Sequence, residues 1–232
     1  MPDYKALYRT QALAYDRMVS AEDVDGAVLK ALERTRPLAG ARVVEVGIGT
    51  GRVTRQLVRS GAVVFGVEPE LAMLDVARSH VTALGGDASL LVQGALASLP
   101  FPDASADLGV AAWVFAHQRR FEPDAWRSTV DGGIRELRRV VREGGAIVLF
   151  ETLGTFVTEP CVPAELEELY RHLETEWGFV REALRTDYQF ESAEVAAEEM
   201  RFFFGDENAK RVLEHGWARV PEVTAAFRLR RS

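Results

Sequence analysis

A glycine-rich turn at residues 47–51 constrains this chain more than any other feature. The apolar run Val43–Val46 before it predicts a buried strand, and a helical pattern begins directly after the last glycine. Glycine lets the backbone turn tightly and approach a ligand without a Cβ in the way. A second apolar run, Val63–Val67, ends on Glu68, about 20 residues after the turn, where a carboxylate can accept hydrogen bonds from ribose hydroxyls. The segment therefore predicts a βαβ unit that binds a nucleoside.

Strands and helices alternate through the first two thirds of the chain. Residues 3–36 show helical spacing, and the apolar runs that follow predict strands at 42–47, 63–68, 90–93, 108–112 and 146–151, with helices between them that include 71–84 and 124–142. After residue 152 the pattern predicts a helix at 163–177, a strand at 184–190, helices at 192–204 and 206–215 and a last strand within 219–230. Alternating elements joined by short turns predict an α/β fold, a doubly wound, mostly parallel sheet with helices on both faces.

Composition excludes several functional classes. The formal net charge of −7 argues against a nucleic-acid partner, because phosphate binding needs a dense basic surface. The longest apolar runs are strand length and too short to span a bilayer, and Met1–Ser20 holds no signal-peptide core. Cys161 is the only cysteine and the four histidines are scattered, so neither a disulfide nor a metal site is expected. We therefore expect a cytoplasmic protein without a membrane or nucleic-acid partner; the oligomeric state is open.

The G-x-G-x-G spacing of the turn resembles motif I of the class I S-adenosylmethionine-dependent methyltransferases. The resemblance implies that S-adenosylmethionine is the cofactor and S-adenosylhomocysteine the product. It places the methionine part of the cofactor on the glycine turn and near Glu45, the ribose on Glu68, and the adenine against the residues after that acid. The cofactor-binding residues implied in this part of the chain are Glu45, Gly47, Gly49, Gly51, Glu68, Pro69 and Met73.

Further segments extend the resemblance over nearly the whole chain. Residues 94–101 resemble the family segment G-D-A-x-x-L-P-F, with Ala95 where the family has an aspartate that bonds the adenine amino group. This departure leaves the backbone of Gly94, Ala95 and Leu96 to contact the ring, and Ala112 at the end of the fourth strand completes the implied cofactor site. Residues 136–145 resemble L-x-R-V-L-K-P-G-G, and residues 186–190 and 201–205 resemble the C-terminal part of methyltransferase type 11 proteins.

The resemblance also implies the architecture. We expect a Rossmann-like, seven-stranded sheet in which the last strand inserts antiparallel. A single methyltransferase domain would span residues 1–232, with residues 1–36 as an N-terminal helical cap. Residues 152–232 would complete the sheet and cover the acceptor site.

The acceptor site is expected at the end of the fourth strand, where open α/β sheets bind ligands. His117 lies there, and its ordinary pKa suits a general base, although a mere contact with the cofactor is also open. Tyr15 resembles a family tyrosine that closes over the cofactor. An apolar acceptor pocket is expected from the aromatic residues Trp113, Phe115, Phe121, Trp126 and Tyr188.

The predicted function is methyl transfer from S-adenosylmethionine to a small-molecule acceptor. Two alternatives stay open on sequence grounds. One is a non-catalytic protein that binds S-adenosylmethionine, because His117 is a weak candidate for a base and Ala95 replaces an adenine contact. The other is a nicotinamide-dependent oxidoreductase on a similar βαβ unit, which the glycine spacing disfavours.

Overall fold

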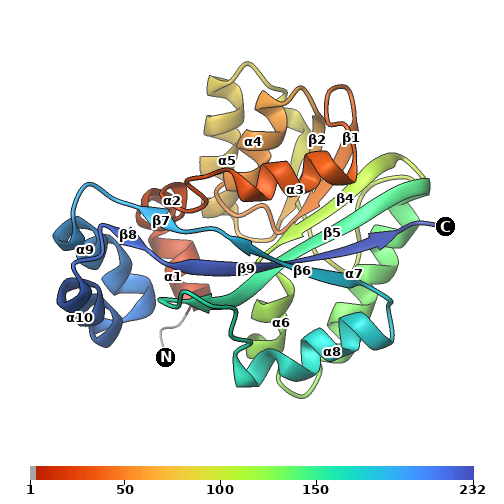
Figure 1. Ribbon diagram of the computed structural model, residues 1–232. Coiled ribbons are helices and arrows are strands. Elements are labelled where there is room, and N and C mark those ends of the chain that lie inside the picture. Colours follow the sequence, from red (N-terminus) through yellow and green to blue (C-terminus); the bar gives the residue numbers. More distant parts are fainter. Residues whose placement is uncertain (1–3) are drawn as a thin grey trace.

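A seven-stranded sheet forms the centre of the computed structural model, which describes residues 4–232 (Figure 1). Its strand order is β3-β2-β1-β4-β5-β9-β6. β9 is antiparallel to both of its neighbours, whereas the pairs from β3 to β5 are parallel. The predicted mostly parallel sheet with an antiparallel last strand is therefore confirmed. The strands are β1 Arg42–Val46, β2 Val63–Glu68, β3 Leu91–Gln93, β4 Ala106–Ala112, β5 Val141–Thr155, β6 Val180–Arg185 and β9 Glu222–Arg230.

Helices cover both faces of this sheet. One face packs against the apolar stripes of α3 and α4, with α5 beside them, and the other face packs against α6, α7 and α8. In α3, for example, Val28, Ala31 and Leu32 recur at helical spacing and are all buried. The helices are α3 Ala27–Thr35, α4 Arg52–Arg59, α5 Leu71–Ala83, α6 Phe115–Phe121, α7 Trp126–Val140 and α8 Glu167–Thr175, and single 3-10 turns lie at Ala88–Leu90 and Ala164–Leu166.

A smaller group of elements stands at one end of the sheet (Figure 1). The second N-terminal helix and the two C-terminal helices share a separate apolar core there, which contains Met18, Phe156, Met200 and Val212. The elements are α1 Tyr4–Thr10, α2 Ala12–Ser20, α9 Ala193–Phe204, α10 Asp206–His215 and the short paired strands β7 Tyr188–Gln189 and β8 Arg219–Val220. The beginning and the end of the chain are thus joined by packing, since α2 contacts α9.

The N-terminal segment is less continuous than predicted. The expected helical region 3–36 begins outside the described residues and consists of three helices, with breaks at Gln11 and at residues 21–26. The second break has a clear physical cause at Asp23, whose φ of 60° is left-handed. Its carboxylate accepts hydrogen bonds from the N–H groups of Ala27 and Val28, at 2.6 and 3.1 Å, and so caps α3.

Two other predicted elements have different bounds. The expected strand 184–190 is divided, because the buried Asp187 accepts hydrogen bonds from Arg185, Arg219 and the N–H of Glu222 and leaves the sheet there. The expected helix 124–142 ends at Val140, and β5 begins at Val141, five residues before the predicted strand. Helix α6 was not predicted at all. Among residues 4–232 no helix has the length and apolar character needed to cross a membrane.

Candidate active site

Two neighbouring cavities open at the carboxyl ends of the parallel strands. The smaller, of about 420 Å³, lies over residues that end or follow successive strands, namely Gly47, Glu68, Gly94 and Ala112. The larger, of about 770 Å³, extends toward the end group of helices. Both volumes fall in the range of small-molecule sites. Tyr15, Trp113 and His117 line both cavities and form a shared wall.

The glycine turn follows β1 directly, and its backbone requires glycine. Gly47 has a φ of +63°, and a Cβ added to it would lie 2.5 Å from Val114 Cγ2. Gly47 and Gly49 line the smaller cavity. Gly51 does not. It caps α4 with a φ of +85°, and its added Cβ would lie 3.1 Å from Ala77, so it sets the close packing of α4 against α5.

Glu68 stands at the end of β2 on the floor of the smaller cavity. Its Oε2 accepts a hydrogen bond from the N–H of Gly49 at 2.8 Å, and its Oε1 accepts one from the N–H of Glu70 at 3.1 Å. These bonds hold the carboxylate against the glycine turn. Burial raises the pKa of Glu68 to about 7, while the two backbone donors act in the opposite direction. The oxygens keep lone pairs for hydroxyl donors of a ligand.

Glu45 lies beneath the glycine turn, beside a small cavity of about 30 Å³ that it shares with Gly47, Gly49 and Tyr15. Its Oε2 accepts a hydrogen bond from the hydroxyl of Thr54 at 2.7 Å. Burial raises the pKa of Glu45 to about 7. The two acids therefore occupy different places: Glu68 lines the smaller cavity of about 420 Å³, whereas Glu45 borders only the side cavity of about 30 Å³.

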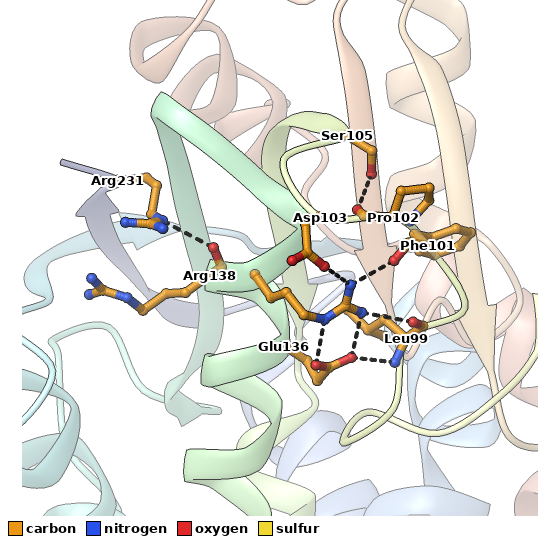
Figure 2. A network of polar contacts seen from close by, with 9 residues as sticks. Leu99, Phe101, Pro102, Asp103, Ser105, Glu136, Arg138 and Arg231 are labelled. Atoms are coloured by element: carbon orange, nitrogen blue, oxygen red, sulfur yellow. Dashed lines mark hydrogen bonds and ion pairs between the residues drawn. The ribbon is translucent and has the colours of Figure 1, made fainter.

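The opposite side of the smaller cavity is formed by Pro69, Met73 and residues 94–97. Two side chains of α7 hold the segment that follows, as Figure 2 shows. The carboxylate of Glu136 accepts the N–H of Leu99 at 2.7 Å, and Arg139 donates to the carbonyls of Leu99 and Phe101 at 2.9 and 2.8 Å. Asp103 pairs with the same guanidinium at 2.7 Å. The network positions the loop that borders the cavity.

Trp113 forms the shared wall in a strained conformation. Its φ of 56° lies in the left-handed region, which bulky residues rarely adopt. The N–H of Trp113 donates to the carbonyl of Phe150 at 2.6 Å, and the guanidinium carbon of Arg52 lies 3.8 Å from its ring centroid. Strain of this kind concentrates at functional sites.

His117 projects from α6 into the same wall. Its Nε2 pairs with the hydroxyl of Tyr8 at 3.1 Å, and its Nδ1 has no hydrogen-bond partner within the described chain. Aromatic rings of Tyr4, Tyr8 and Phe121 surround the imidazole. Burial, with Arg120 second, lowers the pKa of His117 to about 4, so the imidazole is neutral at pH 7.

A cluster of buried acids lines the larger cavity, and sequence reasoning missed it. Glu22, Glu151 and Glu222 are at most 7% exposed, and Arg52 forms an ion pair with Glu22. These residues are far apart in sequence, so no spacing pattern marks them. Glu22 follows α2, Glu151 lies within β5 and Glu222 begins β9, and only the observed topology unites them.

The structure brings only some of the aromatic residues expected at the acceptor site to the two cavities. Trp113 and Tyr188 line the larger cavity, and Phe121 lines the smaller one. Phe115, the first residue of α6, and Trp126, the first residue of α7, line neither cavity, because both are buried in the core. Of the predicted cofactor residues, Tyr15, Gly47, Gly49, Glu68, Pro69, Met73, Gly94, Ala95, Leu96 and Ala112 line the smaller cavity.

Comparison with known proteins agrees with this geometry. A family model described as a methyltransferase domain matches residues 44–149. A demethylmenaquinone methyltransferase of Corynebacterium kroppenstedtii is 31% identical over 194 residues, 81% of this chain and 72% of that protein. An uncharacterised methyltransferase of a Geobacillus species is 28% identical over 155 residues, 65% of this chain and 68% of that protein.

Solved structures share the fold. The YcgJ protein of Bacillus subtilis superposes with a TM-score of 0.57 at 18% identity, over 90% of this chain and 99% of its own. The phosphoethanolamine N-methyltransferase 2 of Haemonchus contortus, solved with S-adenosylmethionine, has a TM-score of 0.58 at 18% identity, over 98% of this chain and 60% of its own. Sequence and fold together show that the chain belongs to the class I S-adenosylmethionine-dependent methyltransferases that act on small molecules.

Proposed function

We propose that this enzyme holds S-adenosylmethionine in the smaller cavity and its acceptor in the larger one. The observation that carries the proposal is the wall of Tyr15, Trp113 and His117, which belongs to both cavities. Methyl transfer needs the two reactants in line and in contact, and a wall common to both sites is where that contact can occur.

The residues of the smaller cavity fit the parts of the cofactor. We assign the ribose hydroxyls to the carboxylate of Glu68, whose two oxygens are held in place by backbone donors. The adenine is assigned to the surface made by Pro69, Met73 and the backbone of residues 94–96. The methionine part is assigned to the glycine turn, with its amino group toward Glu45. Gly51 supports the site by packing and makes no contact in this proposal.

The cofactor supplies a methyl group that its sulfonium has already activated. The contribution of the chain is then to orient the acceptor and to exclude water. His117 contacts the reacting atoms from the shared wall. Because its pKa is lowered to about 4, it is a neutral imidazole at pH 7 and takes up a proton only from an acceptor that releases one readily.

The ends of the chain complete the site in this proposal. The N-terminal cap, predicted as residues 1–36 with 1–3 outside the described part, supplies Tyr8 and Tyr15. The C-terminal part, residues 152–232, supplies β9 and most of the residues that line the larger cavity. We therefore retain the expectation of one methyltransferase domain over residues 1–232.

Calorimetry tests the cofactor assignment. We expect S-adenosylhomocysteine to bind in one copy per chain, and the oxidised nicotinamide dinucleotide not to bind. A folded protein that binds no S-adenosylhomocysteine at millimolar concentration would refute the assignment.

Turnover of labelled S-adenosylmethionine then tests His117. If it contacts the reacting atoms, His117→Gln should lower kcat by about 10²-fold or more and leave the Kd of S-adenosylhomocysteine nearly unchanged. A variant that loses cofactor affinity but keeps its kcat would place His117 in the cofactor site instead.

A further inference from the structure

The larger cavity carries more acid than base. Glu22, Glu151 and Glu222 line its buried part, and Arg52 is the buried guanidinium that faces them in the described chain. Nearer the rim, Arg120 pairs with Glu165 at 3.0 Å. Buried carboxylates are costly unless cations or hydrogen-bond donors satisfy them. Arg52 is already paired with Glu22, and within the described residues neither Glu151 nor Glu222 forms an ion pair; Arg120 and Arg52 act on them only at longer range.

The hydrogen bonds of these two acids are incomplete. Glu151 is fully buried, and its Oε1 accepts the N–H of Phe115 at 2.7 Å. Glu222 is 2% exposed, and its Oε1 accepts the hydroxyl of Thr152 at 3.0 Å. The N–H groups of Val114 and Ala116 also lower the pKa of Glu151, and the hydroxyl of Thr155 lowers that of Glu222. Within residues 4–232, the Oε2 of neither acid accepts a hydrogen bond of ordinary geometry. Two carboxylate oxygens of residues that line one cavity thus have no hydrogen-bond partner, and both are closed to water, so a donor that pairs with them has to displace the atoms that cover them.

Aromatic rings form much of the remaining wall. Tyr4, Trp113, Phe156 and Phe203 line the cavity together with Tyr188, which stands beside Glu22. Ring faces attract cations at close range and also pack against apolar groups. Acids at the base and aromatic rings on the sides match a ligand that has a positive head and an apolar body.

We infer that the acceptor is a small amine with an apolar body, bound as its ammonium ion by Glu151 and Glu222. This inference rests on the proposed function and names the substrate class of that site. Glu151 accepts a hydrogen bond from the N–H of Phe115 in α6, the helix that carries His117 into the shared wall. An ammonium group held by Glu151 therefore lies toward the wall that faces the cofactor, so the amine nitrogen is the methylated atom in this scheme.

Methyl transfer to the amine needs only the cofactor and the Glu151 carboxylate. One proton passes from the ammonium nitrogen to the Glu151 carboxylate, which leaves a neutral amine with a free electron pair. That pair forms the N–CH₃ bond as the bond between methyl and sulfur breaks, and the sulfonium becomes a neutral thioether. The product is a methylated ammonium ion, and the proton on Glu151 leaves to solvent with the product.

The acid–base properties of the cluster suit this step. Burial raises the pKa of Glu151 to about 8 and that of Glu222 to about 8, and Glu22 adds to the shift at Glu222. Both carboxyls therefore hold protons near neutral pH until a cation arrives. The other charged groups that line the cavity are Glu22, Arg52, Arg120, Glu165, Asp206, Glu207 and Arg211. Binding of an ammonium ion should release protons, so amine affinity should rise between pH 6.5 and 8.

Matched ligands of one shape and different charge test the inference. Protein saturated with S-adenosylhomocysteine is titrated calorimetrically with 2-phenylethylamine, 2-phenylethanol and 3-phenylpropionate, and then with the benzyl and naphthylethyl members of the same three series. We expect at least one amine to bind about tenfold or more tightly than its alcohol, and no carboxylate to bind. The same amine should accept a labelled methyl group on nitrogen.

Variants then identify the acids. Glu151→Gln and Glu222→Gln should each weaken amine binding by about tenfold or more and abolish part of the proton release. Glu182→Gln, a change of the same kind at the Arg34 and Arg228 ion pairs outside the cavity, should have no effect. Unchanged S-adenosylhomocysteine affinity in each variant shows that it is folded.

Each outcome decides between the two proposals. If S-adenosylhomocysteine does not bind, the proposed function fails. If it binds and all amines bind no better than their alcohols, or a carboxylate binds best, the amine inference is wrong and the proposed function stands. Amine binding that neither Glu151→Gln nor Glu222→Gln weakens would also overturn the inference, because the acids would not hold the ligand.

Discussion

Replacing Glu68 with glutamine should weaken cofactor binding far more than the same change at Glu45. The carboxylate of Glu68 presents two oxygens to the smaller cavity, and both are fixed by backbone donors of Gly49 and Glu70. A glutamine keeps one acceptor oxygen, and its NH₂ group must face one of those donors. One charge-assisted bond to the ribose, of about 1.5–3 kcal/mol, is lost, and the other becomes neutral and loses about 1 kcal/mol.

Together, the two hydrogen-bond losses in Glu68→Gln cost about 2.5–4 kcal/mol of binding free energy, or roughly a 10²–10³-fold rise in the Kd of the cofactor. Glu45→Gln keeps an oxygen that can accept the Thr54 hydroxyl and lies beside the small side cavity, so its Kd should rise by about tenfold at most. Calorimetry with S-adenosylhomocysteine measures both values, and the Tm of each ligand-free variant reports on folding. Equal affinity of wild type and Glu68→Gln, or a larger loss at Glu45, would refute the ribose assignment.

Three further results are expected from the same structure. Burial raises the carboxyl pKa of both Glu151 and Glu222 to about 8, so the folded state holds protons that the unfolded state has lost, and ligand-free stability should fall as the pH rises from 6.5 to 8. Glu151 should account for about 2 kcal/mol of this fall, and Glu151→Gln should reduce the slope in urea melts by that amount. Gly47→Ala should abolish S-adenosylhomocysteine binding in calorimetry, whereas Gly26→Ala, with a similar φ of +66° and open space around it, should lower only Tm. Arg139→Met should weaken cofactor binding by about tenfold by releasing the loop it holds, and Arg138→Met should not; equal Kd values for the two variants would contradict that role.

The cofactor side of the site could be predicted from the sequence because the residues that mark it lie close together in the chain. The turn at residues 47–51 and the acid at Glu68 lie within one βαβ unit, where residue spacing alone determines which groups share the sheet edge. The strands β1, β2 and β4 are short apolar runs with turn residues around them, and each was predicted within two residues of its bounds.

The acceptor side could not be predicted in the same way. Helix α6 lacks a long apolar stripe, and its start depends on Glu151, which accepts the N–H of Phe115 across the site. The divided strand near Asp187 depends on Arg219 and Glu222. These contacts join residues more than thirty positions apart, so no local pattern encodes them.

The buried acids on both sides of the shared wall have one physical property in common. Glu68 faces the cofactor cavity with a pKa raised to about 7, and Glu151 faces the other cavity with a pKa raised to about 8. A buried carboxyl of this kind lowers stability, so its position beside a cavity favours a role in ligand binding. Ribose hydroxyls that donate to Glu68, and an ammonium ion beside Glu151, both favour the ionised form. Each ligand should then displace a proton, and both affinities should rise with pH over the interval in which the ligand-free protein becomes less stable.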